Sequence, residues 1–345
     1  MNILLSICIP TYNRAKYLKE ALESILPQTS DEIEIVVSDN ASPDDTREVV
    51  ARLQKVTSIR IVYERSAVNQ GNDWNFLRVV ELASGRYCWL FGDDDRMAPG
   101  AIYDVLEQIR QNPEVDVFLG DRENFDLNFK KKFNWRPILK QAKEQVFDFN
   151  KIPVSAYLKE VNKLPGIFSF ISGMIFKKDK WAAVEGRDEY LGSRYIHIYM
   201  FMSILWGKHP GVLKYLPDRI VLARWGNDQS FKPGALLERI KYDVEIFHNT
   251  AFKILKDPKT VKQIDAILIK NDLFSWSVRA RATAGWKFYS EIIPFLFHYY
   301  RGVPLFWLKI VPLMFVPRSL LIFARWGYRV AIKGERLGLN EVYDI

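Results

Sequence analysis

The sequence has little cysteine, and its first residues are not expected to form a targeting signal. Only two cysteines occur, Cys8 and Cys88, each inside an apolar, strand-like run. Their separation gives neither a metal-ligand spacing nor a disulfide framework, so we interpret both as reduced core residues. The first apolar run, Ile3–Leu5, reaches Pro10 without a basic leader and does not resemble a signal peptide. We therefore expect a cytoplasmic location.

Two signatures of nucleotide binding are also missing. Neither GxGxxG nor GxxxxGK[ST] occurs in the 345 residues, which argues against a nicotinamide fold of the usual kind and against a P-loop. The net charge of +8 favours an anionic partner, but it does not choose among phosphates, nucleic acid and lipid headgroups.

What the sequence does have is a regular alternation of strand-like and helix-like segments. The expected strands are Ile3–Ile9, Ile33–Val37, Ile59–Tyr63, Tyr87–Phe91 and Val115–Leu119. The expected helices are Leu18–Leu26, 44–55 with Ser42 as its cap, Phe76–Leu82 and 99–111. Alternation at these lengths predicts an α/β fold, with a parallel sheet covered by helices on both faces.

One of these strands ends in a cluster of acids. Tyr87–Phe91 is followed by Gly92 and three consecutive carboxylates, Asp93, Asp94 and Asp95. Neighbouring acids repel one another and are costly to desolvate, so a fold tolerates them mainly where a cation compensates. Mg²⁺ takes carboxylate oxygens and recruits substrate phosphates as further ligands. The cluster predicts a metal–phosphate site; a solvated acidic turn is the alternative.

Four polar loops follow predicted strands. They are Pro10–Arg14, Asp39 with Asn40, Asn69–Asn72 and Asp93–Asp95. Ligands of an open parallel sheet sit outside the carboxyl ends of its strands. We therefore expect these loops to converge on one rim and to form a binding site there.

The same loops resemble the motifs of family 2 glycosyltransferases of the GT-A fold. The matching stretches are Ser6–Arg14, Val36–Ser42, Asn69–Asn72 and Phe91–Asp95 continuing to Pro99, and they lie within residues 1–120. Within this family the sequence is most similar to bacterial O-antigen transferases of the abequosyltransferase type, because of its Gly-Asp-Asp-Asp run and a later Tyr190–Ser193 followed by His197. The resemblance implies a Rossmann-like, mostly parallel sheet flanked by helices.

The resemblance also implies which residues bind the nucleotide sugar. They are Pro10, Thr11, Tyr12, Arg14, Asp39, Asn40, Gly71, Asn72, Asp93, Asp94, Arg224, Asn227 and Asp228. Two of them have structural alternatives: Asp39 could cap the loop before the next helix, and Arg14 could be a solvated charge at a helix start.

A divalent metal follows from the resemblance as well. Asp93, Asp94 and Asp95 would hold Mg²⁺ or Mn²⁺ against the donor diphosphate and stabilise the departing nucleotide. Alignment on Pro99 places Asp94 at the family's main metal ligand. Gly92 stands where many members carry the first acid of the motif, so Asp93 and Asp95 are both candidates for the second ligand.

Residues 121–165 have weaker periodicity and more charge, which is typical of an insertion or a β-hairpin near the acceptor. Their lysine run, Lys130–Lys132, is expected to be a solvated face. Strand character resumes at Phe168–Phe176, which contains Ser172 and Gly173. In the family such a pair lies near the acceptor, where glycine lets a sugar approach the backbone.

The general base is the least defined part of the predicted site. The Glu-Asp pair typical of inverting members is missing, and Tyr195–His197 occupies its place. His197 is therefore a candidate base, with a buried histidine on an aromatic helix as the alternative. Asp121, Asp188 and Glu189 remain further candidates. Without a clear base, a mechanism that retains configuration stays open.

A last predicted strand, Val212–Ala223, leads into the polar loop Arg224–Ser230. In the resembling enzymes this loop folds over the diphosphate, so Arg224 could pair with a phosphate, and Asn227 or Asp228 could reach the metal. A lid and a plain turn are the two interpretations of this loop.

The composition changes in the last third of the chain. Two helices are expected, Leu236–Leu255 and Val261–Tyr289, and the residues beyond them are apolar, aromatic and interrupted by prolines. Residues 301–333 carry six basic residues and no acid. No uncharged stretch is long enough to favour a spanning helix. We expect a basic, aromatic surface that lies on anionic lipid, or else a packed helical appendage that serves as an oligomer interface.

These expectations combine into one prediction. Residues 1–232 form a GT-A domain, with a nucleotide-binding half at 1–120 and an acceptor-binding half at 121–232, and residues 233–345 form a helical, membrane-associating region. The domain transfers a deoxy- or dideoxyhexose from a CDP-, UDP- or dTDP-linked sugar to a polyprenyl-diphosphate-linked oligosaccharide. This would occur at the cytoplasmic face of the bacterial inner membrane, on the way to O-antigen or another surface polysaccharide.

Other functions remain as alternatives. They are a transferase with a soluble or cell-wall acceptor and a non-enzymatic, membrane-bound nucleotide-binding scaffold. Nucleic acid is not an expected partner, because the basic-aromatic material lies in a proline-broken tail while the predicted rim is acidic. A homo-oligomer is compatible with the sequence.

Overall fold

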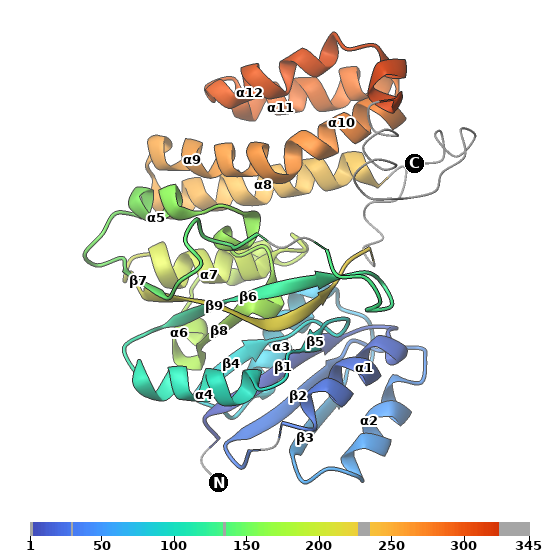
Figure 1. Ribbon diagram of the computed structural model, residues 1–345, viewed down its shortest axis with the longest axis vertical. Coiled ribbons are helices and arrows are strands. Elements are labelled where there is room, and N and C mark those ends of the chain that lie inside the picture. Colours follow the sequence, from blue (N-terminus) through green and yellow to red (C-terminus); the bar gives the residue numbers. More distant parts are fainter. Residues whose placement is uncertain (1–2, 29, 134–135, 227–234, 324–345) are drawn as a thin grey trace. The chain divides into compact units, whose positions relative to one another are not determined.

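The computed structural model describes residues 3–28, 30–133, 136–226 and 235–323 (Figure 1). The chain divides into two compact units, residues 1–227 and 228–345. The predicted boundary between residues 232 and 233 falls in a segment that the structure does not describe. Each unit is presented by itself.

Strands and helices alternate in the first unit, which confirms the predicted α/β class. The first elements are β1 Leu5–Thr11, α1 Ala15–Ile25, β2 Ile33–Asp39, α2 Thr46–Gln54, β3 Arg60–Arg65, α3 Asn72–Leu82, β4 Tyr87–Leu90, β5 Arg96–Met97, α4 Ala101–Gln111 and β6 Val117–Phe125. The later elements are β7 Gln145–Asp148, α5 Val154–Glu160, β8 Met174–Lys177, α6 Lys178–Ala182, α7 Ile196–Trp206 and β9 Val212–Arg224.

All these strands belong to one mixed sheet. Its order is β3-β2-β1-β4-β8-β6-β9-β5, and β7 pairs with β9. Strands β1 to β4 are parallel, as predicted, but β8 runs antiparallel to both β4 and β6. Beyond β4 the sheet is mixed, because β8, β5 and β7 run antiparallel to their neighbours while β6 and β9 pair in parallel. The chain enters β8 at the carboxyl end of β4, where Ser172 Oγ accepts a hydrogen bond from Gly92 N, so β8 has to return in the opposite direction.

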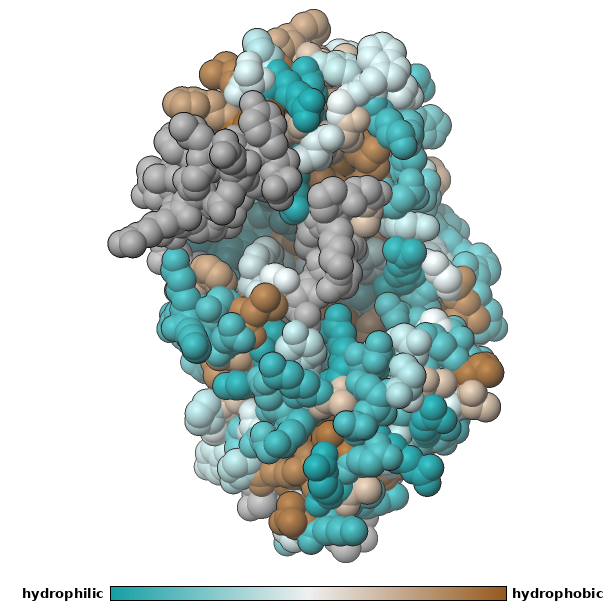
Figure 2. Space-filling model, turned by 90° about the vertical axis from the view of Figure 1, so that its right-hand side faces the viewer, coloured by the Kyte–Doolittle hydropathy of each residue, from teal (hydrophilic) through white to brown (hydrophobic). Residues whose placement is uncertain are grey.

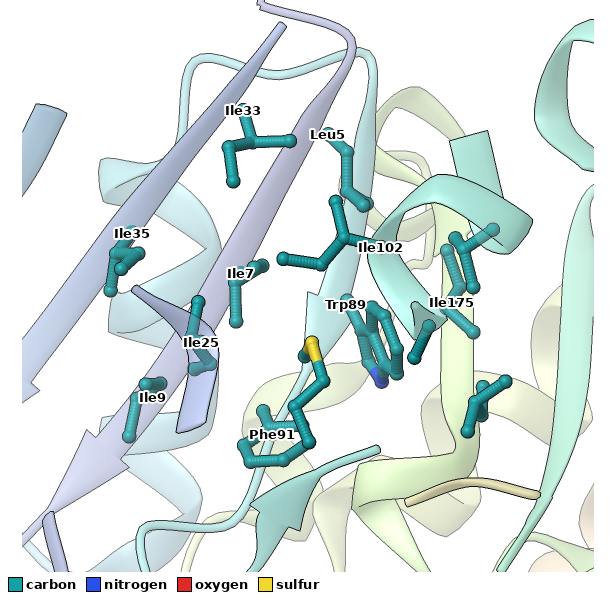
Figure 3. Close-up of a cluster of buried hydrophobic side chains, with 14 of the residues drawn as sticks. Leu5, Ile7, Ile9, Ile25, Ile33, Ile35, Trp89, Phe91, Ile102 and Ile175 are labelled. Atoms are coloured by element: carbon teal, nitrogen blue, oxygen red, sulfur yellow. The ribbon is translucent and has the colours of Figure 1, made fainter. Parts of the chain in front are cut away.

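The core of this unit follows from the period-two alternation of its strands. Leu5, Ile7 and Ile9 of β1 share a buried cluster with alternate residues of β2 and with apolar faces of α1 and α4 (Figure 3). Burying one such side chain contributes about 1.5–3 kcal/mol. Helix α3 packs on β1 and β2 from the other face and contacts α7 there (Figure 1). The inner strands are thus covered on both sides, which explains their continuous apolar sequences.

Helix α2 begins later than predicted. Its first residue is Thr46, whose N–H and hydroxyl both donate to Asp44 Oδ1, at 3.3 Å and 2.6 Å. The expected cap, Ser42, instead accepts from Asn13 N at 2.9 Å and donates its own N–H to Asp39. Ser42 therefore connects the loops after β1 and β2, and the prediction that it caps the helix is wrong.

The expected strand Phe168–Phe176 is mostly irregular. The chain forms two 3₁₀ turns, Leu164–Ile167 and Ile171–Gly173, and Phe168 adopts φ 70°, so only Met174–Lys177 extends into the sheet. A Cβ at Gly173 would lie 2.7 Å from the carbonyl oxygen of Gly120. Gly173 is thus required for the close approach of its strand to β6, and the space beside it is filled by protein rather than open to a sugar.

The region 121–165 contributes to the sheet rather than forming a separate insertion. After β6, Phe125 and Lys132 form an antiparallel bridge, and β7 adds to the sheet beside β9. The side chains of Lys130–Lys132 are exposed, as expected for a solvated face.

The second unit is helical over its described residues. It contains α8 Leu236–Leu255, α9 Pro258–Leu268, α10 Phe274–Thr283, α11 Ile293–Tyr300 and α12 Pro304–Lys309, with π-helical turns at Ile269–Leu273 and Phe288–Ile292. The first predicted helix is confirmed at both ends, and the second, Val261–Tyr289, is confirmed as far as Thr283. It breaks at Gly285, where φ is 57°, a conformation that other residues rarely adopt. None of the described helices combines the length and apolar character needed to cross a bilayer.

The contact at Gly173 gives a stability prediction. We expect Gly173→Ala to lower the free energy of unfolding by about 1–3 kcal/mol, because its Cβ meets a backbone oxygen that cannot move without shifting β6. Urea denaturation measures this change. Val56→Ala, at a side chain that is 77% exposed, is the control and should change stability by less than about 0.5 kcal/mol. Equal stability of Gly173→Ala and the wild type would contradict the crowding.

Candidate active site

The loop after β4 meets the loop after β1 through its carboxylates. Thr11 Oγ1 donates to Asp93 Oδ2 at 2.7 Å. Arg14 Nη1 lies 3.3 Å from Asp93 Oδ1 and 2.8 Å from Asp94 Oδ2, so it forms ion pairs with both acids. Two of the predicted rim loops therefore come together, and Arg14 is not a purely solvated charge.

Two other strands hold the third carboxylate. Ser172 Oγ, just before β8, donates to Asp95 Oδ2 at 2.6 Å, and the backbone N–H of Arg224, at the end of β9, donates to Asp95 Oδ1 at 2.9 Å. Ser172 also accepts from Gly92 N at 2.9 Å. Both oxygens of Asp95 are thereby fixed by groups that lie far away in the sequence.

Burial makes the acidic loop electrostatically strained. Desolvation raises the pKa of Asp93 and of Asp95 to about 7, and the charge of Asp94 adds to both shifts. Arg14 opposes the shift at Asp93, and the hydrogen bond from Ser172 opposes it at Asp95. Asp94, with 24% of its side chain exposed, is the most accessible of the three. Positive charge beside Asp94 would lower the cost of keeping the loop ionised.

The loops after β2 and β3 meet at the same rim. Asn40 Nδ2 donates to Asn69 Oδ1 at 2.9 Å and to the Gly71 carbonyl oxygen at 3.1 Å, and its Oδ1 accepts from Gln70 N at 2.9 Å. Gly71 adopts φ 88° and is followed directly by α3, whose first residue is Asn72. The expected convergence of four loops is present in the structure.

Asp39 organises the loop that it begins. It is fully buried, and its carboxylate accepts from Ser42 N at 2.8 Å and from the Tyr63 hydroxyl at 2.6 Å, while Arg65 Nε lies 3.6 Å away. Burial and this contact raise the pKa of Tyr63, so its hydroxyl stays protonated and donates. This is the capping role that the sequence left as an alternative, and contact of Asp39 with a nucleotide stays a prediction. Beside it, Pro10 is half-buried and Tyr12 is 41% exposed.

Arg224 lies where it cannot reach a donor phosphate. Only 2% of its side chain is exposed. Its Nη2 donates to Glu20 Oε2 at 2.6 Å, its Nε donates to the Asp94 carbonyl oxygen at 2.8 Å, and its Nη1 donates to Leu127 O. The predicted pairing of Arg224 with phosphate is therefore wrong in this structure. Asn227 and Asp228, predicted in the same loop, lie outside the described residues.

His197 has the environment of a core residue. It is 3% exposed and packs against the rings of Phe76 and Tyr195, whose centroids lie 5.4 Å and 5.9 Å away. Within the described part of the chain neither ring nitrogen has a hydrogen-bond partner, and desolvation lowers its pKa to about 3. A group with that pKa is a weak proton acceptor at neutral pH. The structure thus matches the alternative, a buried histidine on an aromatic helix, and contradicts the choice of His197 as base.

The other candidate bases differ in accessibility. Asp121 is 1% exposed, and it accepts from the Tyr215 hydroxyl at 2.6 Å, from Ile138 N at 3.0 Å and from Arg122 N at 2.8 Å. It therefore holds strands together and is poorly placed to receive a proton. Asp188 and Glu189 lie in an exposed 3₁₀ turn, Arg187–Tyr190.

Two polar residues of α3, Asp73 and Asn75, were not predicted from the sequence. Asn75 donates to the Ser38 carbonyl oxygen at 3.1 Å and to that of Thr11 at 3.3 Å. Asp73 accepts from Arg194 N at 2.7 Å and from Ile196 N at 3.0 Å, where α7 begins. Their signal in the sequence was a pair of polar side chains on a helix that directly follows the Gly71 loop.

Comparison with known proteins decides the family. The model of glycosyl transferase family 2 matches residues 6–158. Abequosyltransferase RfbV of Salmonella typhimurium is 33% identical over 288 residues, which are 82% of this chain and 85% of RfbV. The chain belongs to glycosyl transferase family 2. This family 2 glycosyltransferase is also 30% identical to the GalNAc(5)-diNAcBac-PP-undecaprenol beta-1,3-glucosyltransferase of Campylobacter jejuni over 145 residues, 42% of this chain and 47% of that protein.

Solved structures of low sequence identity share the fold of this glycosyltransferase. S. aureus TarS 1–349 in complex with UDP-GlcNAc has a TM-score of 0.60 at 16% identity, and the match covers 96% of this chain and 93% of that one. Mannosyltransferase PcManGT from Pyrobaculum calidifontis, in complex with GDP-Man and Mn²⁺, has a TM-score of 0.55 at 16% identity, with 97% and 89% covered. These matches support the GT-A-like architecture.

The acidic loop can supply only some of the ligands of a divalent cation. Among the residues that the structure describes, no three His, Cys, Asp or Glu side chains converge as a metal cage. Mg²⁺ and similar ions commonly use one or two carboxylates and complete their shell with substrate phosphates and water. Asp94 is the most accessible acid, and its contact with Arg14 would have to be exchanged for the cation. The donor set therefore fits an ion that is held jointly by this loop and a diphosphate.

The raised pKa values predict how stability depends on pH. In the folded protein Asp93 and Asp95 stay protonated up to about pH 7, whereas in the unfolded chain they ionise near pH 4. The folded state binds more protons between these values. With chelator present, the free energy of unfolding should therefore fall as pH rises from about 4 to about 7, by about 1.4 kcal/mol per pH unit for each of the two acids.

Chemical denaturation across this pH range measures the slope. Asp93→Asn combined with Asp95→Asn should flatten it, because neither amide titrates. Asp104→Asn, an exposed acid on α4, serves as the control and should keep the wild-type slope. A slope that is the same in the double variant and the wild type would show that these two acids are not the source.

Proposed function

We propose that this glycosyltransferase moves a deoxy- or dideoxyhexose from a nucleotide diphosphate sugar to a polyprenyl-diphosphate-linked oligosaccharide, in the synthesis of O-antigen or a related surface polysaccharide. The observation that carries the donor half of this proposal is the strained acidic loop Asp93–Asp95, joined to Thr11 and Arg14 at the carboxyl ends of β1 and β4. The sugar and acceptor classes are supported by the names of the relatives: RfbV is an abequosyltransferase, and the Campylobacter enzyme is named for a glycan on diphosphoundecaprenol.

The donor would lie along the rim, with its base and ribose near Tyr12 and Asn40 and its diphosphate near Asp94. The exposed ring of Tyr12 and the Asn40–Gly71 contact are suited to the base and ribose, and the donor carries CDP, UDP or dTDP. The diphosphate would then reach Asp94 and Arg14. Mg²⁺ or Mn²⁺ bound there would neutralise the charge that develops on the leaving diphosphate. Arg14, once its carboxylates are compensated, can pair with a phosphate oxygen through its planar fork.

The chemistry is a substitution at the anomeric carbon. The oxygen of an acceptor hydroxyl forms a bond to C1 of the sugar, and the bond from C1 to the phosphate oxygen breaks. The electron pair leaves with the nucleotide diphosphate, and the hydroxyl proton passes to a base. Of the predicted bases, Asp188 and Glu189 are the ones whose side chains are open to solvent. The buried Asp121 and His197 would instead support the fold around the acceptor.

We further propose that the second unit binds the cytoplasmic surface of the bacterial inner membrane, where a polyprenyl-linked acceptor is found. Within its described residues, the segment 307–323 exposes large apolar side chains: Trp307 48%, Leu308 74%, Phe315 80%, Leu320 55% and Phe323 64%. Basic residues lie among them, including Arg301 and Lys309. Brown patches interrupt the mostly hydrophilic surface in Figure 2. Such a surface suits the interface of an anionic bilayer.

Donor binding is tested with nucleoside diphosphates. In titration calorimetry with Mn²⁺, we expect CDP, UDP or dTDP to bind the wild type at least about tenfold more tightly than Asp94→Asn, because the variant loses a charged cation ligand. With chelator the two proteins should bind alike. Asp104→Asn should behave as wild type, since Asp104 is exposed on α4. Affinities that are equal for wild type and Asp94→Asn, both with Mn²⁺ and with chelator, would refute a cation-dependent donor site.

Membrane binding is tested by sedimentation with vesicles of phosphatidylethanolamine and phosphatidylglycerol. Leu308→Glu combined with Phe315→Glu should move most of the protein from the pellet to the supernatant, because acids on this surface repel anionic lipid and resist burial. Val56→Glu, whose site is as exposed in the first unit, should leave the pellet fraction unchanged. A double variant that sediments like the wild type would count against this surface.

A further inference from the structure

Glu20 lies outside every motif but connects two arginines at the acidic loop. It is on α1, and its Oε2 accepts from Arg224 Nη2 at 2.6 Å and from Arg96 Nη2 at 2.8 Å. Partial burial would raise the pKa of Glu20, and the bonds from Arg96 and Arg224 lower it below its ordinary value. The carboxylate is therefore a fixed negative charge behind the loop.

Arg224 connects Glu20 to the acidic loop, because it binds both. Its Nε donates to the Asp94 carbonyl oxygen at 2.8 Å, and its backbone N–H donates to Asp95 Oδ1 at 2.9 Å. The guanidinium is planar and rigid, so the contact of one Nη with Glu20 sets the direction in which Nε points. The faces of Tyr17 and Phe129 enclose it, with centroids 4.7 Å and 4.5 Å from Cζ.

Arg96 secures the other end of the same loop. It follows Asp95 directly, shares Glu20 Oε2 with Arg224, and lies 4.1 Å from the centroid of Phe129. The Glu20 carboxylate thus contacts the acidic loop in two ways. It binds Arg96, which directly follows the loop, and it binds Arg224 of β9, which itself binds the loop. The hydrogen bond from Arg224 fixes the carbonyl group of Asp94, and this limits the directions in which the Asp94 side chain can point.

We propose that Glu20 is a positioning residue, which acts through Arg224 to hold the Asp94–Asp95 segment in the geometry that binds a cation and the donor diphosphate together. The inference rests on the proposed donor site and assigns no contact between Glu20 and the substrate. Its expected effect is large for its distance from the chemistry, because a misplacement of about 1 Å at a reacting group costs about 100-fold in rate.

The test compares two glutamates of the same helix. Glu20→Gln keeps the shape of the side chain and removes the charge, and Glu23→Gln does the same at a position that is 50% exposed and faces Lys19. The probe is whichever of CDP, UDP and dTDP binds the wild type most tightly with Mn²⁺. We expect Glu20→Gln to weaken Mn²⁺-dependent binding at least about tenfold. Binding with chelator and the thermal midpoint should stay at the wild-type values, and Glu23→Gln should match the wild type throughout.

The route through Arg224 is tested by a double-mutant cycle. Arg224→Lys keeps a positive charge near Glu20 but lacks the fork that reaches both Glu20 and the Asp94 carbonyl. If Glu20 acts through Arg224, the double variant binds no more weakly than Arg224→Lys alone. If the loss of affinity in the double variant equals the product of the losses in the two single variants, Glu20 does not act through Arg224. In sugar-transfer assays, Glu20→Gln should raise KM for the donor and leave KM for the acceptor unchanged.

The outcomes separate this inference from the proposed function. If the wild type binds none of the three nucleotides in a Mn²⁺-dependent way, the proposed donor site fails and the inference fails with it. If the wild type binds and Glu20→Gln binds equally well, the inference alone is overturned. A thermal midpoint that falls in Glu20→Gln while Mn²⁺-dependent binding by its folded fraction is unchanged would make Glu20 a fold residue, which also overturns it.

Discussion

The first unit depends on one unfavourable interaction, the repulsion among three neighbouring carboxylates that are partly or fully removed from water. Burial raises the pKa of Asp93 and Asp95, and the charge of Asp94 between them adds to the effect. Residues beside the neighbouring strands supply hydrogen-bond donors: the hydroxyl of Thr11 donates to Asp93, and the hydroxyl of Ser172 donates to Asp95. Such contacts reduce the strain without removing it. A site held in this state gains most when a cation arrives, because the cation relieves a cost that the fold already bears.

Two arginines near this loop illustrate how position decides what the same side chain does. Arg14 has 35% of its side chain exposed and contacts the carboxylates from the rim, so a cation or a phosphate can compete for it. Arg224 has 2% exposed and spends its donors on Glu20, on Leu127 and on the Asp94 carbonyl. From the sequence both were expected at the nucleotide sugar, Arg224 as a phosphate ligand and Arg14 among the nucleotide-binding residues, because both are basic residues beside predicted strand ends. The difference lies in burial and in partners that are remote along the chain.

The sequence was sufficient wherever the determinants are local. Apolar runs and turn residues placed β1, β2 and β4 correctly, and the rule for parallel sheets brought their polar ends together. It failed where the decision depends on distant contacts. The chain reaches β8 at the carboxyl end of β4, where Ser172 contacts Gly92, and Ser42 is not the cap of α2 because its hydroxyl accepts from Asn13 N. Neither partner can be identified from spacing alone.

The same limit applies to the candidate bases and to Asp73, which joins α3 to the start of α7. His197 was selected because it stands in the place of the family's Glu-Asp pair, whereas Asp73 belongs to no motif, and neither spacing nor residue type reveals the partners of a buried side chain. Asp73 lies two residues beyond the Gly71 loop and accepts from the backbone at Arg194 and Ile196. The start of α3 and the start of α7 are thus one hydrogen-bonded unit. The Asp73 carboxylate therefore fixes the segment before α7 to the helix that begins at the Gly71 loop.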